Sequence, residues 1–107
     1  MTKQRMQQIY DGVQRKHGLE LAGTTASTSS VRSAFVEMRQ VLDVENASEE
    51  EKRAFSSTIQ KAINEGIWRV ADHRTATSDL LKSAFTGAAQ ETTEQVVSLS
   101  LKPVKFE

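Results

Sequence analysis

Asp72 and His73 are the side chains of this sequence best suited to catalysis, because a carboxylate can orient an imidazole that activates a hydroxyl group. The candidate nucleophile is Ser78 or a serine of a loop. Adjacent residues on a helix point about 100° apart, however, so the pair would not readily share a hydrogen bond there. No serine lies in a nucleophile-elbow motif. We therefore expect no catalytic residues and a protein that is not an enzyme.

Metal and cofactor chemistry also lacks a sequence motif. His17 and His73 are 56 positions apart, and neither belongs to a Glu-x-x-His motif or has a second histidine at helical spacing. A site made from His73, Asp72 and distant carboxylates is the alternative. The chain has no cysteine, and its five glycines are scattered, so both glycine-rich phosphate-binding motifs are absent. We expect no metal and no cofactor.

Acidic side chains are concentrated in residues 37–51, which carry six acids and one arginine. Such a run can serve general acid–base catalysis when it is buried, but more often it is the solvated start of a helix. Ser48 and Glu51 form a capping-box motif, which accounts for part of the run. Residues 1–17 and 52–82 each carry a net charge of +3, although the whole chain is neutral. This separation favours pairing of the acidic segment with a basic helix of a neighbouring copy.

The basic segments suggest a second class of function, a small helical nucleic-acid-binding regulator. Trp68 beside Arg69 loosely resembles a base-stacking arrangement. No known DNA- or RNA-binding motif is present, and zero net charge removes bulk attraction to nucleic acid. The candidate nucleic-acid-binding residues are Lys3, Arg5, Arg15, Lys16, Arg69 and Arg74.

Hydrophobic periodicity predicts a mainly α fold, a bundle of three or four helices with one or two short peripheral β-strands. The predicted helices cover residues 3–16, residues 31–44, a segment from Ser48 that ends near Ile63 or continues past Gly66 to Val70, and a segment around Leu80–Ala89. The alternation of Val97, Leu99 and Leu101 predicts a C-terminal strand near residues 95–102.

The length of 107 residues predicts one domain. Its expected parts are an N-terminal helix (1–18), a flexible connector (23–30), a helical core (31–90), and a C-terminal strand and tail (95–107). Leu, Ile, Val and Phe make up 24 residues, only slightly above the fraction of about 20% below which chains tend to be disordered. The core is therefore expected to be thin.

Trp68 has two alternative positions. In a continuous third helix it falls opposite the apolar face, beside Lys61 and Asp72, where the single tryptophan would face a partner. If the helix instead breaks at Gly66, Trp68 can turn into the core.

The C-terminal strand needs hydrogen-bond partners for its backbone. Leu19–Ala22 is the internal candidate, and the other solution is a neighbouring chain. The predicted partner-binding residues are Trp68, Arg69, Lys61, Asp72, Val97, Leu99 and Leu101.

Together these features predict a non-catalytic interaction or assembly protein that binds itself, as a homo-oligomer, or docks on a larger complex. Small accessory proteins of this kind suit a virus, a phage or a mobile element. No signal peptide and no apolar run of membrane-spanning length occurs, so we expect a cytoplasmic protein without a membrane partner.

Overall fold

The computed structural model describes residues 1–19, 25–66, 68–70, 74–87, 96–99 and 104–107, of which residues 68–70, 74–76, 96 and 98–99 are described by their backbone. These residues form a mainly helical fold, as the sequence predicts. The helices are α1 (Lys3–Lys16), α2 (Thr28–Val44), α3 (Glu49–Asn64) and α4 (Arg74–Thr86). Three short strands accompany them, β1 (Thr25–Ser27), β2 (Trp68–Val70) and β3 (Val96–Leu99).

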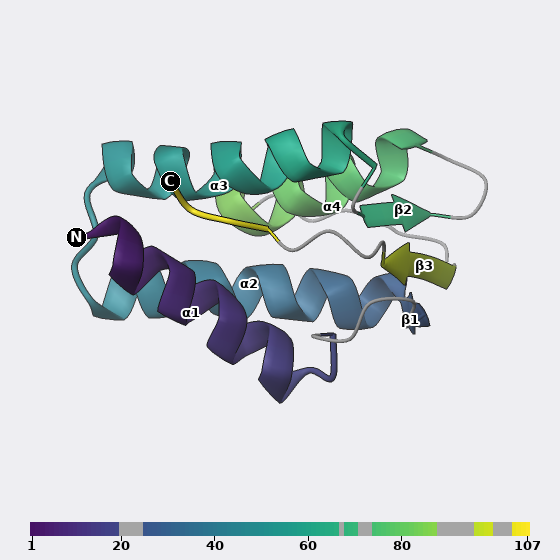
Figure 1. Cartoon of the computed structure of the whole chain (residues 1–107), viewed down its shortest axis with the longest axis horizontal. Coiled ribbons are helices and arrows are strands. Elements are labelled where there is room, and N and C mark those ends of the chain that lie inside the picture. Colours follow the sequence, from purple (N-terminus) through teal and green to yellow (C-terminus); the bar gives the residue numbers. More distant parts are fainter. Residues whose placement is uncertain (20–24, 67, 71–73, 88–95, 100–103) are drawn as a thin grey trace.

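The helices form two pairs. Helix α1 packs on α2, α3 packs on α4, and the contact between α2 and α4 joins the two pairs. Figure 1 shows the strands together at one end of the helices, and the C-terminal segment between α1 and α3.

Local sequence signals set the ends of the helices. The capping box at α3 is confirmed: the Glu51 amide donates to Ser48 Oγ at 3.1 Å, and the Ser48 amide donates to Glu51 Oε1 at 2.9 Å. Helix α1 ends where Gly18, with φ +69°, takes the left-handed conformation. Helix α3 ends at Asn64, before Gly66, so a continuous helix to Val70 is not formed and Trp68 lies on β2.

Asn46 closes the tight turn between α2 and α3. Its φ is +58°, and the Ala47 amide donates to the Leu42 carbonyl at 2.9 Å, as in a Schellman C-cap. We expect Asn46→Ala to lower the free energy of unfolding by about 1 kcal/mol, because the Cβ atom of alanine crowds the backbone in the left-handed conformation without the local hydrogen bonds that the asparagine side chain can make, whereas Asn46→Gly should be neutral within about 0.5 kcal/mol. Urea unfolding of both variants tests this, and equal losses for the two would contradict it.

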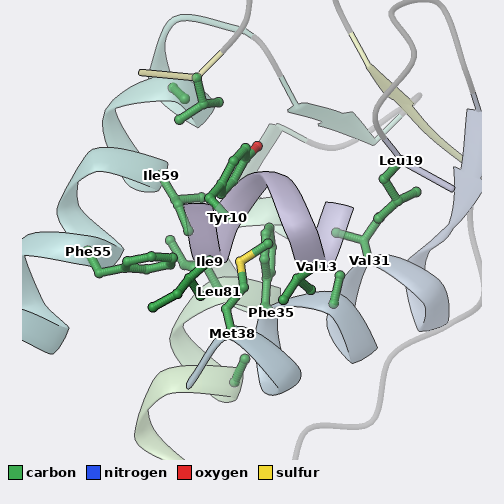
Figure 2. Packing of buried hydrophobic residues seen from close by; sticks show 14 of the residues in the cluster. Ile9, Tyr10, Val13, Leu19, Val31, Phe35, Met38, Phe55, Ile59 and Leu81 are labelled. Carbon is green, nitrogen blue, oxygen red and sulfur yellow. The ribbon is translucent and has the colours of Figure 1, made fainter. Parts of the chain in front are cut away.

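The hydrophobic core is one cluster to which all four helices contribute. The apolar side chains of α2 form a stripe that faces this cluster: Val31, Ala34, Phe35, Met38 and Leu42 are fully buried, and Val41 is partly buried. Figure 2 shows Phe35 and Met38 beside Ile9 and Val13 of α1, with Phe55 and Ile59 of α3 nearby. Val97 of β3 and two residues after the last strand, Val104 and Phe106, also belong to this cluster.

The sheet bears on two expectations. Strand β3 lies in the centre, antiparallel to both neighbours, with Ala26 and Val70 opposite Val97. The C-terminal strand therefore finds its backbone partners within the chain, in β1 and β2, and the alternative of pairing with a neighbouring chain is not the one observed. Residues 25–30, expected to be a flexible connector, form β1 and the first turn of α2. The alternative pairing segment, Leu19–Ala22, lies outside the described residues except for Leu19.

Candidate functional site

Residues 104–107, called the tail below, lie between α1 and α3 (Figure 1). Val104 and Phe106 are buried, with 6% and 7% of their surface exposed, whereas Lys105 and Glu107 are exposed. This alternation is typical of an extended segment that presents one face to a core. The tail is thus held as a peptide is held on a protein surface, by every second side chain.

The side-chain amide of Gln7 on α1 holds the tail backbone. Gln7 Nε2 donates to the Val104 carbonyl at 3.0 Å, and Gln7 Oε1 accepts from the Phe106 amide at 2.7 Å. Gln7 Nε2 also donates to Asp11 Oδ1 at 3.0 Å, which orients the amide. One glutamine therefore supplies a donor and an acceptor, the two groups that a neighbouring strand offers. These bonds do not depend on which side chains the bound segment carries.

Aromatic rings receive Phe106. Its ring centroid lies 5.6 Å from that of Tyr10 on α1 and 4.7 Å from that of Phe55 on α3. Phe55 in turn stacks on Phe85 of α4 at 6.0 Å. We call Gln7, Tyr10 and Phe55 the tail-binding site. Two helices contribute to it, so tail binding also joins α1 to α3.

Some residues predicted to bind nucleic acid instead form ion pairs that join α1 to α2 and to the end of α2. Arg5 Nε donates to Glu45 Oε1 at 2.7 Å, and Arg5 Nη2 binds the second oxygen of the same carboxylate. Lys16 Nζ donates to Glu37 Oε1 at 2.8 Å, and His17 Nε2 is 3.6 Å from that oxygen. Hydrogen bonds from Arg5 and Lys16 lower the pKa of Glu45 and of Glu37, respectively. Arg5 and Lys16, both predicted to bind nucleic acid, are thus paired with carboxylates.

The acidic segment is also paired with cations between α2 and α3. Lys52 Nζ donates to Asp43 Oδ1 at 2.8 Å and to Glu49 Oε1 at 2.9 Å. Arg39 Nε lies 3.6 Å from Asp43 Oδ2. The hydrogen bond from Lys52 is the main cause that lowers the pKa of Asp43. The cations that the sequence led us to expect from a neighbouring copy thus come from the chain itself.

These ion pairs predict that the stability of the fold depends on pH. The pKa values of Glu37, Asp43 and Glu45 are lowered on folding. Their stabilisation is therefore present above the unfolded values of about 4 and is lost as the pH falls through the lower folded values. We expect the melting temperature to drop between about pH 5 and pH 3, and 1 M NaCl to reduce the drop, because exposed pairs are screened by salt. The melting temperature of Glu45→Gln should fall less between about pH 5 and pH 3 than that of Glu50→Gln. Equal falls for the two variants would contradict the role of the Arg5–Glu45 pair.

Three buried polar atoms have no hydrogen-bond partner in the described part of the chain: Gln14 Oε1, His17 Nε2 and Thr77 Oγ1. Gln14 Nε2 donates to the Tyr10 hydroxyl at 3.1 Å. No group of three or more His, Cys, Asp or Glu side chains that could hold a metal occurs among the described residues.

The predicted partner-binding residues separate in the structure. Val97 is fully buried and belongs to the hydrophobic core. Lys61 is exposed on α3. Trp68 and Leu99 face each other in the register of β2 and β3, and Arg69 lies between Trp68 and Val70. The side chains of Trp68, Arg69 and Leu99, and the residues Asp72, His73 and Leu101, lie outside what the structure describes.

Of the predicted nucleic-acid-binding residues, Lys3 and Arg15 are exposed on α1, and Arg69 and Arg74 are described by their backbone alone. The tail-binding site was not predicted from the sequence. The available signal was the alternation of Val104, Lys105 and Phe106 after Pro103. Nothing in the sequence distinguishes Gln7 from the other glutamines of the first helix.

No family model matches the chain, and no curated protein or solved structure matches it. Among the described residues, no helix is long and apolar enough to cross a membrane.

Proposed function

We propose that this protein is a non-catalytic interaction protein that binds extended peptide segments at the tail-binding site. The observation that carries the proposal is the double hydrogen bond of Gln7 to the tail backbone, combined with burial of Val104 and Phe106. Backbone bonds that supply affinity, with pockets for alternate side chains that supply specificity, are a general mode of peptide recognition. The recognised pattern is two apolar residues separated by one residue of any type.

The state of the carboxylates also supports a non-catalytic role. A general acid that works near neutral pH needs a raised pKa, obtained by burial or by a like charge. Hydrogen bonds from cations instead lower the pKa of Glu37, Asp43 and Glu45. These groups stabilise the packing of α1, α2 and α3. The wider proposal is an assembly or docking role in the cytoplasm, for a protein of a phage, virus or mobile element.

Selection from a library of random peptides tests the proposal. We expect the Phe106→Ala variant, whose own tail fills the site poorly, to enrich peptides with two apolar residues at positions i and i+2, and the full chain, whose own tail competes for the site, to enrich them less. Adding Gln7→Ala should weaken binding at least tenfold, because two hydrogen bonds to the peptide backbone are lost. The matched control is Lys105→Ala, which changes an exposed tail residue. Enrichment that is absent, or unchanged by Gln7→Ala, would overturn the proposal.

The alternative proposal, a nucleic-acid-binding regulator, predicts affinity for duplex or single-stranded DNA that falls steeply with salt. The pairing of Arg5 with Glu45 and of Lys16 with Glu37 reduces the positive charge that α1 offers to phosphates. We therefore expect fluorescence anisotropy to detect no salt-dependent DNA binding by the full chain. A strong salt dependence would favour the alternative.

A further inference from the structure

The tail and the tail-binding site are complementary surfaces of one chain. Nothing in the contacts between them requires that the tail come from the same copy as the site. Gln7 contacts the backbone of residues 104 and 106, and the rings of Tyr10 and Phe55 contact the ring of Phe106. All of these contacts would be the same if the tail came from another copy.

Release of the tail would leave two complementary surfaces on the same molecule. Tyr10 and Phe55 would lose the ring that covers them, and Val104 and Phe106 would be exposed to water. Exposed apolar surfaces of this kind favour association. Two opened copies can cover both surfaces on each by reciprocal exchange, which closes a twofold symmetric dimer without any new contact.

We infer that two copies of this chain form a dimer in which the tail of each copy, residues 104–107, binds Gln7, Tyr10 and Phe55 of the other. The inference rests on the proposed function, because it requires that the site binds an extended segment, and it names a second copy as the partner. Within one chain the tail has an effective concentration in the millimolar range, so the monomer dominates in dilute solution and exchange is expected at high local concentration.

Complementation between two full-length variants tests this inference. The chain has no cysteine, so Ser57→Cys on the exposed face of α3 gives one labelling position. A donor-labelled Gln7→Ala chain keeps a normal tail, and an acceptor-labelled Phe106→Ala chain keeps a normal site. We expect energy transfer in the mixture, with a dissociation constant at least tenfold lower than for either variant alone, because only the mixed pair contains an intact tail in an intact site.

The matched control replaces Phe106→Ala with Lys105→Ala, whose own tail still fills its site, and should show less transfer. Transfer in the mixture that equals that of each variant alone would overturn the inference. A second measurement uses wild-type chains, donor- and acceptor-labelled, mixed at millimolar concentration, warmed near the unfolding midpoint, cooled and diluted. We expect a fraction with twice the monomer mass by light scattering, together with energy transfer, and monomer alone would overturn the inference.

The outcomes separate the inference from the proposed function. If peptides with the i, i+2 apolar pattern are selected and both dimer measurements fail, the site binds foreign segments, and the proposed function stands without the dimer. If peptide selection also fails, the proposed function falls as well.

Discussion

Truncation of Phe106 to alanine should lower the free energy of unfolding by about 3–5 kcal/mol, the range for a buried phenylalanine replaced by alanine. The ring is 7% exposed and contacts Tyr10 on one helix and Phe55 on another. Its loss leaves a cavity between α1 and α3, at a place where the tail supplies the packing. Urea unfolding monitored by circular dichroism measures the change.

The control for Phe106→Ala is the neighbouring variant Lys105→Ala, which removes an exposed side chain of the same tail. Surface substitutions usually change stability by less than about 0.5 kcal/mol. If both variants lost a similar, small amount, the tail would not be packed as described.

Replacing Val97 by lysine should have an effect as large or larger, and the chain is expected to lose cooperative unfolding. Val97 is fully buried on the central strand, and a buried ammonium without a partner costs several kcal/mol. Val44 provides the matched control, because it is the same residue type with 80% of its surface exposed. Val44→Lys should stay within about 0.5 kcal/mol of wild type.

Thermal melts of the two lysine variants distinguish core from contact surface. A folded Val97→Lys chain that failed to bind a partner would restore the original prediction that Val97 is a partner contact. An unfolded Val97→Lys chain beside a normal Val44→Lys chain supports the position of β3 within the core.

Local features of this fold could be predicted from the sequence because their causes lie within a few residues. The capping box of Ser48 and Glu51 needs two side chains three positions apart. The buried stripe of α2 needs a helical period, which Val31, Phe35 and Met38 supply. Each signal sits within one element, and the structure confirms both.

The sheet and the tail-binding site could not be predicted, because their causes join distant residues. Strands β1 and β2 have three residues each, too few to show an alternation, and they are strands because β3 pairs with them. Gln7 meets Val104 across 97 positions. The ion pairs illustrate the same limit. The sequence shows that acidic and basic residues are separated along the chain, but not that Arg5 and Glu45 pair with each other within it.

The position of β3 has a consequence for biosynthesis. The central strand of the sheet, β3, is the last of the three in the sequence. Strands β1 and β2 therefore have no partner in this sheet until β3 has been synthesised. During translation the segments of β1 and β2 have unpaired backbone groups, which can pair with other chains. A nascent chain halted before residue 96 should therefore depend on chaperones, and insertion of β3 would end that dependence after the rest of the helical scaffold has emerged.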